Sequence, residues 1–298
     1  MSAILYYLVI LPLSRLPYWC LYGLSDVLFV IFYRLSGYRK KVVLGNLRRS
    51  FPEKNEAEIR TIAQKFYRHF CDMIVESIKN FSISREEALK RVKSTNPEVV
   101  AQFARQGKHV IVAAGHNNNW ELWGVAAPMH FEHELIAIYK PLSNAYFDKK
   151  MRKSRQKFGM RMEPMSAANG ILTEPGAKPK ALVLAIDQSP GNPQKAYWTK
   201  FLHQDTGVLF GTELYAARFK IPVLYGHLKK VKRGHYEITY EVFTTDGSQH
   251  PYGYVTRGMT AILEKDIIAE PEYWLWTHKR WKHPMPANRL LDESQPPA

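Results

Sequence analysis

The residues best suited to chemistry lie in one short stretch, Gly115 to Glu121, which reads GHNNNWE. It contains a histidine and, five positions later, a glutamate, with three asparagines between them. A neutral histidine can remove a proton from a hydroxyl group, and a nearby carboxylate can orient the ring and stabilise the imidazolium. The stretch contains no serine or cysteine nucleophile. The hydroxyl that His116 would activate therefore belongs to a substrate, and no covalent enzyme intermediate is expected.

The His-x4-Glu spacing is not specific by itself, because a chain of this composition contains about one such match by chance. Side chains five positions apart lie about 140° apart around a helix axis, so the two can meet only if His116 lies in a turn and Glu121 in the first turn of a helix. Gly115 would permit the bend, and the helix N-terminus would help to keep His116 neutral. A second interpretation stays equally open: His116 is a capped turn histidine and Glu121 a first-turn acid that suits the helix dipole.

The stretch lies in a chain where short apolar runs alternate with helical patterns. The predicted strands are residues 109–114, 134–139, 181–186, 221–228 and 235–243. The predicted helices are residues 56–79, 97–105, 119–128, 144–158, 208–219 and 254–269. This alternation predicts an α/β fold, in which a central, mostly parallel or mixed sheet has helices on both faces.

Ligands of open α/β sheets bind where strand ends meet helix starts, and the His116 turn lies at such a place. Asp187 and Gln188 follow the strand 181–186, so the chain can bring them near His116; a plain turn before Ser189 is the alternative.

Gly211 and Thr212 open a predicted helix. Its free backbone amides suit a phosphate or a developing oxyanion, although Thr212 is also an ordinary helix-start residue.

The N-terminus is unusually apolar and aromatic. Residues 3–13 read AILYYLVILPL and residues 16–33 read LPYWCLYGLSDVLFVIFY. The first segment is too short to span a bilayer and the second is near the lower limit. No basic region precedes them and no clear cleavage site follows, so a retained membrane anchor is favoured over a signal peptide. We therefore expect an anchor over residues 1–36, followed by one α/β domain over residues 37–298.

The chain carries 42 Lys and Arg against 27 Asp and Glu, a formal charge of +15 over 298 residues. Such an excess predicts an anionic partner. Between Arg34 and Arg49 the charged residues are all basic, which is typical of a segment on the cytoplasmic side of a membrane anchor. We read the charge as directed to the membrane rather than to nucleic acid. The two cysteines support no disulfide framework, and no ligand spacing predicts a metal site.

Several sequence blocks together resemble the bacterial lipid A late acyltransferases, within the lysophospholipid acyltransferase superfamily. They are the His-x4-Glu motif, NLRRSFPE (46–53), YKPLSNAYFDKKMRKSR (139–155), AIDQSPG (185–191), GTELYAARFKIPVLYG (211–226) and EYWLWTHKRWK (272–282). The resemblance covers nearly the whole chain. It implies a glycerol-phosphate-acyltransferase-like fold and transfer of a fatty acyl group from a thioester, usually on acyl carrier protein, to a lipid hydroxyl.

The resemblance also implies site roles. His116 and Glu121 would be catalytic, with His116 as general base and Glu121 orienting its ring. Arg155 would bind a substrate phosphate or structure the site, and Lys140 stands where the family commonly has arginine, which removes bidentate phosphate recognition there. The substrate-binding candidates are Asn119, Lys140, Asn144, Arg155, Asp187, Gln188, Gly211, Thr212, His278 and Arg280.

We accordingly expect a membrane-bound O-acyltransferase for a lipid A precursor at the bacterial inner membrane, with its catalytic domain on the cytoplasmic side. The expected partners are acyl carrier protein, an anionic lipid acceptor and the membrane; no metal, tightly bound cofactor or nucleic acid is expected. One alternative keeps the chemistry but uses acyl-CoA or another acceptor, such as a glycerolipid or an amino-acid lipid. A more distant alternative is a non-catalytic basic protein that binds membrane or nucleic acid.

Overall fold

The computed structural model describes residues 2–292 and 294. The N-terminal region contains α1 (Ser2–Leu5), η1 (Tyr6–Ile10), α2 (Leu11–Arg15), α3 (Tyr18–Phe29) and η2 (Val30–Leu35). The other α-helices are α4 (Lys40–Ser50), α5 (Glu56–Lys79), α6 (Arg85–Arg91), α7 (Glu98–Arg105), α8 (Trp120–Ala126), α9 (Ala145–Arg155), α10 (Ala168–Ile171), α11 (Gly211–Phe219) and α12 (Tyr254–Ala269). The strands are β1 (Val92–Ser94), β2 (Val110–Ala114), β3 (Glu134–Tyr139), β4 (Arg161–Pro164), β5 (Lys180–Ala185), β6 (Tyr197–Phe201), β7 (Gln204–Val208), β8 (Val223–Lys232) and β9 (His235–Thr244).

Seven strands form one sheet in the order β1-β9-β8-β2-β5-β3-β4, and β6 and β7 form a separate hairpin. Within the sheet, β8 and β9 pair antiparallel and the other neighbours pair parallel. The predicted α/β fold with a mostly parallel, mixed sheet is confirmed. Because β2, β5 and β3 are adjacent and parallel, their carboxyl ends meet at one edge, where the predicted site residues follow them.

The sequence pattern did not predict β1, β4 or the β6–β7 hairpin. β1 and β4 have only three and four residues, too few for a periodic pattern. β7 is mostly polar and carries the exposed Asp205, and in β6 the exposed Lys200 interrupts what would otherwise be a mostly apolar run. These segments are identified as strands only by their hydrogen-bonded partners in the structure, because strand formation depends on tertiary context.

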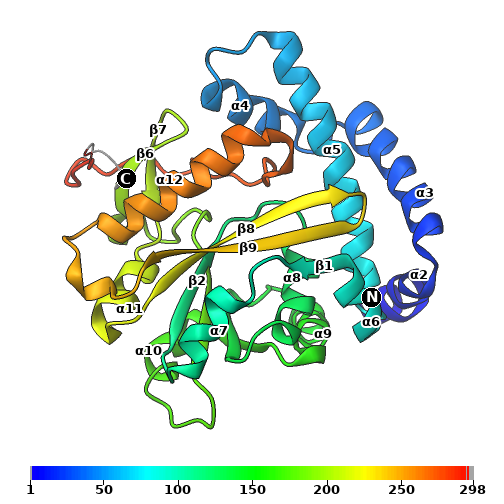
Figure 1. The fold of residues 1–298 in the computed structure, drawn as a ribbon. Helices are drawn as coiled ribbons and strands as arrows, with labels where there is room; N and C mark the ends of the chain where they lie inside the picture. Colours follow the sequence, from blue (N-terminus) through cyan, green and yellow to red (C-terminus); the bar gives the residue numbers. More distant parts are fainter. Residues whose placement is uncertain (1, 293, 295–298) are drawn as a thin grey trace.

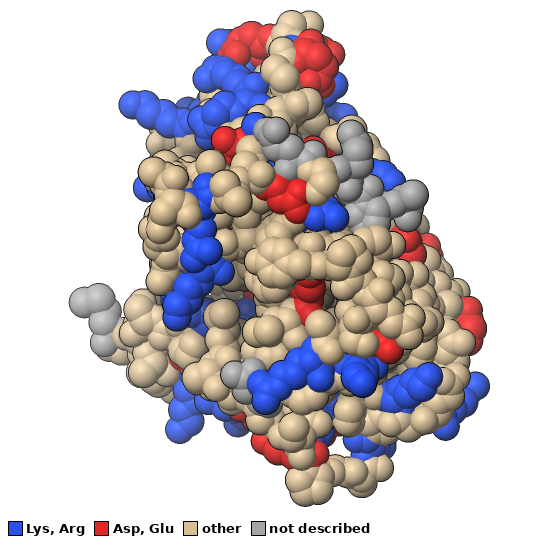
Figure 2. All heavy atoms as spheres, turned by 90° about the vertical axis from the view of Figure 1, so that its left-hand side faces the viewer, with Lys and Arg blue, Asp and Glu red and all other residues tan. Residues whose placement is uncertain are grey.

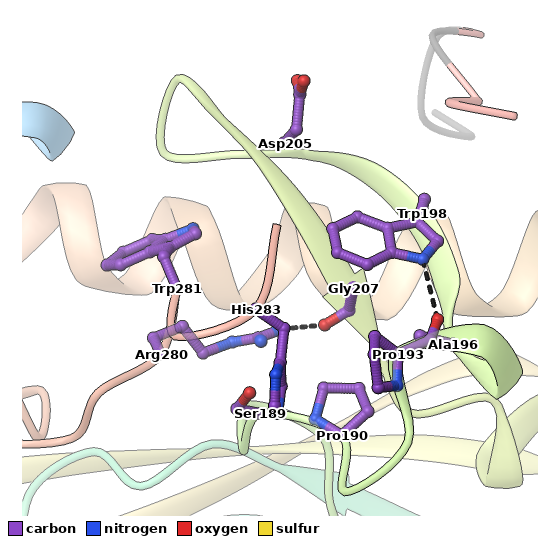
Figure 3. A pocket seen from close by; sticks show the side chains of 10 residues that line it. All are labelled: Ser189, Pro190, Pro193, Ala196, Trp198, Asp205, Gly207, Arg280, Trp281 and His283. Carbon is purple, nitrogen blue, oxygen red and sulfur yellow. Dashed lines mark hydrogen bonds between the residues drawn. The ribbon is translucent and has the colours of Figure 1, made fainter. Parts of the chain in front are cut away.

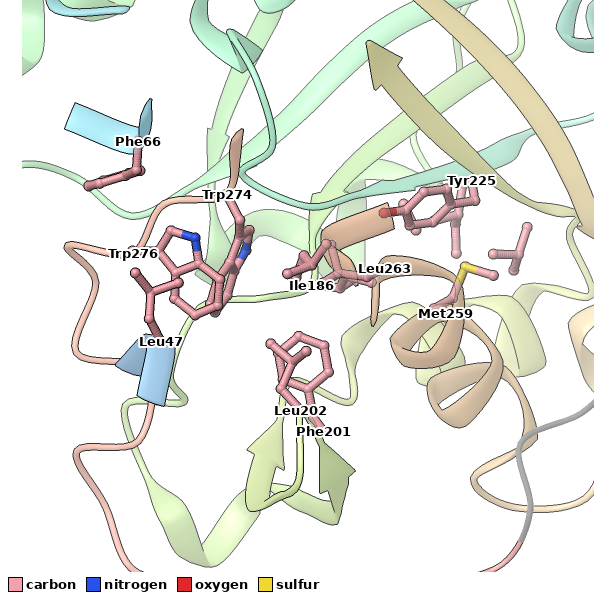
Figure 4. Packing of buried hydrophobic residues seen from close by; sticks show 14 of the residues in the cluster. Leu47, Phe66, Ile186, Phe201, Leu202, Tyr225, Met259, Leu263, Trp274 and Trp276 are labelled. Carbon is pink, nitrogen blue, oxygen red and sulfur yellow. The ribbon is translucent and has the colours of Figure 1, made fainter. Parts of the chain in front are cut away.

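Helices cover both faces of the sheet and two apolar clusters hold them there (Figure 1). On one face, α5, α11, α12 and the segment around Trp274 and Trp276 pack against strand residues such as Ile111 and Tyr225. Figure 4 shows the two tryptophans beside Leu47 and Phe66, in the part of this cluster farthest from Tyr225. On the other face, α6, α7 and α8 pack against the alternate strand residues, including Val112 and Leu224.

The N-terminal helix α3 lies alongside α5 (Figure 1). The segment Tyr18–Leu35 is long and apolar enough to cross a membrane. Its inner side buries the apolar Leu21 and Phe29 but also makes polar contacts. The Tyr22 hydroxyl donates to Glu76 at 3.0 Å and the Ser25 hydroxyl to Asp72 at 2.7 Å. Its outer side is apolar and exposed, with Trp19, Val27 and Leu35 prominent among the exposed side chains. The helix is thus bound to the rest of the chain through both apolar packing and hydrogen bonds, whereas an apolar stripe faces outwards.

The turn between β2 and α8 is shaped by close packing. A Cβ atom on Gly115 would lie 2.4 Å from Cδ1 of Leu263 on α12, so any other residue here would force the Leu263 side chain or the turn to shift. The left-handed conformation in the turn belongs to Asn118, with φ of 52°. Gly115 therefore serves the packing of α12, and Asn118, rather than Gly115, takes the strained backbone of the bend.

Substitution of Gly115 by Ala is expected to destabilise the fold by about 1–3 kcal/mol, because the added methyl group must displace Leu263 or the turn. The matched control is Gly124→Ala on α8, where a Cβ atom meets no atom within 4 Å. Alanine at that helical position is expected to stabilise the fold by about 0.5–1 kcal/mol. Denaturant unfolding of the detergent-solubilised protein measures both, and equal stability of the Gly115→Ala variant and the unaltered protein would refute the packing argument.

Candidate active site

A cavity of about 970 Å³ opens at the carboxyl edge of the sheet. Seven of the twelve predicted site residues line it: His116, Glu121, Lys140, Arg155, Gln188, Gly211 and Thr212. Most of the remaining lining is apolar. The apolar lining includes the side chains of Trp123, Met160, Met162 and Val183, and Gly124 on α8 also lines the cavity. This size is at the upper end of ordinary ligand pockets, and the apolar surface suits a long hydrocarbon chain.

His116 is oriented by Asp187. Its Nδ1 lies 2.5 Å from Oδ1 of Asp187, and its backbone N–H donates to Oδ2 of the same carboxylate at 2.7 Å. The Asp187 side chain is 3% exposed. The two residues meet because β2 and β5 are parallel neighbours and each residue follows the end of its strand. The predicted contact of the His116 ring is thus made by Asp187 and not by Glu121.

The pair is also coupled electrostatically. Burial alone would lower the pKa of His116, but the charge and hydrogen bond of Asp187, with a contribution from Glu121, outweigh burial and raise this pKa above its ordinary value. For Asp187, burial opposes ionisation. The His116 charge, its hydrogen bonds and the Trp274 indole outweigh burial and hold the pKa of Asp187 well below its usual range. Asp187 is therefore an anion that stabilises a protonated His116.

Glu121 forms a bidentate pair with Arg155. The guanidinium Nε and Nη2 atoms lie 2.9 and 2.5 Å from the two carboxylate oxygens. Two such parallel bonds fix both side chains at the cavity wall. Burial lowers the pKa of Arg155, but the Glu121 carboxylate more than compensates and the pKa is raised. Glu121 therefore acts on His116 through charge across the site, while its hydrogen bonds are made with Arg155.

The second ring nitrogen of His116 is directed to the cavity side. Its Nε2 lies 3.2 Å from the side-chain amide nitrogen of Gln188, which is exposed. An amide N–H can only donate, so this contact fits a tautomer with the proton on Nδ1 and a free lone pair on Nε2. Trp120 contacts the ring edge-on at 4.8 Å between centroids and limits its rotation. The arrangement presents a basic nitrogen to the cavity.

Two predicted substrate-binding residues are helix caps instead. Asn119 is fully buried; its side-chain oxygen accepts the Leu122 N–H at 2.9 Å and its amide nitrogen donates to Glu76. Asn144 caps α9 by accepting the Phe147 N–H at 3.2 Å, and its amide nitrogen donates to Ser2. Both lie outside the cavity lining. Asparagine is as suitable for capping as for binding a ligand, which is why sequence reasoning did not separate the two roles.

His278 and Arg280 also lie outside the cavity lining and act behind the site. Burial lowers the pKa of His278 to about 4, so the neutral ring accepts the Ser189 backbone N–H at 3.1 Å. Arg280 is 3% exposed and donates to the Gly207 carbonyl at 2.8 Å. Figure 3 shows this guanidinium near His283 and Ser189, beneath the β6–β7 hairpin. His278 thus holds the segment that follows Gln188, and Arg280 holds β7.

Sequence reasoning missed two residues that hold the site together. The Trp274 indole donates to Oδ2 of Asp187 at 2.8 Å, and Trp274 is 1% exposed. Glu76, on α5, accepts the hydrogen bond from Asn119. The tryptophan-rich block before residue 282 could have indicated a role for Trp274, since a buried indole N–H usually donates to a hydrogen-bond acceptor. Glu76 lies on the buried face of an amphipathic helix, where a carboxylate is unexpected and therefore informative.

The described residues include no group of three or more His, Cys, Asp or Glu side chains arranged to hold a metal ion. Charge is instead spread over the surface. On the face shown in Figure 2, Lys and Arg side chains form several groups separated by uncharged surface. Lys140, at the cavity, is exposed.

Replacement of Asp187 by Asn is expected to lower the pKa of His116 below its value in the unaltered protein, because the buried anion that favours imidazolium is lost. Glu121→Gln is expected to lower it less, since Glu121 acts only through charge. Nuclear magnetic resonance titration of ¹⁵N-histidine-labelled protein measures the change. His227, which pairs with Asp266 at 3.0 Å, is the internal control and should not shift. A larger effect of Glu121→Gln than of Asp187→Asn would reverse the assignment of the orienting residue.

Comparison with known proteins bears on what this site does. The family model for bacterial lipid A biosynthesis acyltransferases matches residues 1–283. The lipid A biosynthesis palmitoleoyltransferase of Escherichia coli (strain K12) is 22% identical over 249 residues, covering 82% of this chain and 79% of that protein. A lipid A biosynthesis acyltransferase of Shigella flexneri matches with the same identity and coverage. The predicted resemblance is thus confirmed over nearly the whole sequence, and the chain belongs to the bacterial lipid A biosynthesis acyltransferase family and is an acyltransferase.

Proposed function

We propose that this acyltransferase moves a fatty acyl group from an acyl thioester on acyl carrier protein to a hydroxyl group of a lipid A precursor, with His116 as general base. One observation carries the proposal: His116, which Asp187 orients from behind, lies at the wall of a large apolar cavity and directs a basic nitrogen towards it. Membership of the lipid A family supports the acceptor class.

In the proposed reaction, Nε2 of His116 takes the proton of the acceptor hydroxyl as the oxygen attacks the thioester carbonyl carbon. The hydroxyl takes the place of the Gln188 amide nitrogen, which lies 3.2 Å from Nε2 of His116. The imidazolium that forms is stabilised by Asp187 and, through charge, by Glu121. Collapse of the tetrahedral intermediate breaks the carbon–sulfur bond, and the thiolate takes the proton from His116, so that ester and thiol are the products.

During the attack, negative charge develops on the oxygen of the thioester carbonyl. Hydrogen-bond donors near the reacting carbon would stabilise it. Gly211 and Thr212 line the cavity at the N-terminus of α11, where the first backbone amides of a helix have no intrahelical partner. We assign them to the oxyanion or to a lipid phosphate, since both are anions that a helix N-terminus favours.

The charged side chains at the cavity suit an anionic lipid. Lys140 is exposed at the lining and supplies a point charge for a phosphate. Arg155 is held by Glu121, so we assign it first to structuring the site and only second to the phosphate. The net charge of +15 favours approach to an acidic carrier protein and to an anionic membrane surface. A basic segment follows the apolar N-terminal helices, which supports a place at the inner membrane with the catalytic part on the cytoplasmic side.

The decisive experiment measures transfer of labelled acyl groups from acyl carrier protein and CoA thioesters by the detergent-solubilised protein. The acceptors offered side by side are a lipid A precursor, a lysophospholipid and an amino-acid lipid. Transfer to the lipid A precursor from the carrier protein is expected, and His116→Ala should reduce it at least about 100-fold, because general base catalysis contributes about 10²–10⁴.

A matched control for that experiment is His130→Ala, which removes a histidine outside the cavity lining and should leave transfer near the unaltered level. Transfer only to another lipid would retain the mechanism and replace the substrate. A folded His116→Ala protein with full activity would refute the role of the base, and absence of transfer to every acceptor would refute the proposed reaction.

Chain-length preference is expected to depend on Gly124. This residue lines the cavity on α8, and a side chain there would extend into open space. Gly124→Leu should therefore shift the preferred donor towards shorter acyl chains, because the larger side chain shortens the apolar space. Competition between donors of different length measures the shift. Gly23→Leu on α3, where a Cβ atom also meets no atom within 4 Å, is the control; an unchanged preference in Gly124→Leu would exclude this part of the cavity as the acyl site.

A further inference from the structure

A carboxylate with three hydrogen-bond donors is buried between the N-terminal helix and the active-site turn. Glu76 on α5 is 0% exposed. Its Oε1 accepts from the Tyr22 hydroxyl at 3.0 Å, and its Oε2 accepts from the Asn119 amide at 2.5 Å and from the Tyr236 hydroxyl at 2.8 Å. These donors come from three separate elements, α3, the start of α8 and β9. One side chain thus joins the apolar N-terminal region, the sheet and the turn that carries the proposed base.

The burial of this carboxylate is costly and calls for an explanation. Burial raises the pKa of Glu76 above its ordinary value, and the three donors only partly offset the effect. Among the ion pairs formed by the described residues, none includes Glu76. Apolar side chains could fill the same volume without that cost, so the carboxylate has a use that packing alone does not require.

That use is visible at Asn119. Its side-chain oxygen accepts the Leu122 N–H and thereby caps α8, which leaves its amide nitrogen as the donor to Glu76. An ionised carboxylate has no hydrogen to donate and can only accept hydrogen bonds. Glu76 therefore holds the NH₂ group of the Asn119 amide, which leaves the amide oxygen to cap α8. α8 begins with Trp120, which contacts the His116 ring, and Glu121, which pairs with Arg155. The orientation of Asn119 therefore determines where both of these side chains lie.

The other end of the connection is Tyr22 on α3, the helix whose outer side exposes an apolar stripe. α3 is also bound by the Ser25–Asp72 hydrogen bond and by Arg233, which lies 2.8 Å from Asp26 and 2.7 Å from Asp72. These contacts fix the position of α3 on α5, but only the Tyr22 hydroxyl reaches the carboxylate that contacts Asn119. The Tyr22–Glu76 and Glu76–Asn119 hydrogen bonds therefore connect α3 to the start of α8.

We infer that Glu76 is a positioning residue that couples the docking of the N-terminal helix to the geometry of the His116 turn, through Tyr22 on one side and Asn119 on the other. The inference deepens the proposed function and rests on it for the catalytic role of His116. It gives the N-terminal helix a part in building the active site, in addition to the anchoring predicted for it.

The test uses the full-length, detergent-solubilised protein and three variants, Tyr22→Phe, Glu76→Gln and Tyr18→Phe. Tyr18→Phe is the matched control: it makes the same substitution one turn earlier on α3, at a hydroxyl that is not a donor to Glu76. Acyl transfer gives kcat and KM for the thioester, and ¹⁵N-histidine resonance titration gives the pKa of His116, with the signal assigned through His116→Asn. All measurements are made below the unfolding temperature of each variant.

Tyr22→Phe and Glu76→Gln are expected to lower kcat by about threefold or more while KM changes by less than about twofold, since positioning acts on the transition state. The pKa of His116 should fall in both, because Glu121 moves with α8. Unchanged kcat and unchanged His116 titration in Tyr22→Phe and Glu76→Gln would overturn the inference, as would equal losses in Tyr18→Phe, which would show a general effect of α3 packing. Absence of transfer in the unaltered protein would refute the proposed function, and the titration would still test the connection.

Discussion

The structure depends on one short contact between two parallel strand ends, the hydrogen bond between His116 and Asp187. A buried carboxylate is stable only where donors surround it, and here the donors are the His116 ring, its own backbone N–H and the Trp274 indole. The His116 donors follow β2, the indole comes from the C-terminal segment, and the accepting carboxylate follows β5. The adjacent order of β2 and β5 in the sheet is therefore a requirement of the site as well as of the core.

Much of the fold followed from sequence, because its signals are local. The strands 110–114 and 134–139 and the helices 56–79 and 254–269 lie within one residue of their predicted bounds, since apolar periodicity and caps such as Asn55 define them. These local signals did not identify the partner of His116, although the order of the strand ends predicted that Asp187 could lie near it. Glu121 is near in sequence, whereas Asp187 is 71 positions away and is near only through strand order. Which of two carboxylates meets a histidine is decided by the topology of the sheet.

The asparagines show a second limit of sequence reasoning. Asn119 and Asn144 have the residue type and position expected of ligand-binding groups, yet each uses its side-chain oxygen to begin a helix. Capping and binding draw on the same chemistry, so only the direction of the side chain separates them. Glu121 and Arg155 were likewise predicted to have separate roles, yet their side chains form hydrogen bonds to each other. These pairings place positive and negative charge at a fixed separation beside the base, which free surface residues could not do.

The turn that carries His116 is held by backbone contacts to Tyr273 and Trp274, which lie far from it in the sequence. Asn117 bridges to Trp274, and the Asn118 N–H donates to the Tyr273 carbonyl at 2.8 Å. During synthesis on the ribosome, β2 and its turn emerge more than 150 residues before these partners, as the numbers 117 and 274 show. A nascent chain thus carries His116 without the indole and the backbone contacts that hold Asp187 in place. The reactive geometry is completed only when the tryptophan segment has been translated, so catalytic competence comes well after the synthesis of His116 itself.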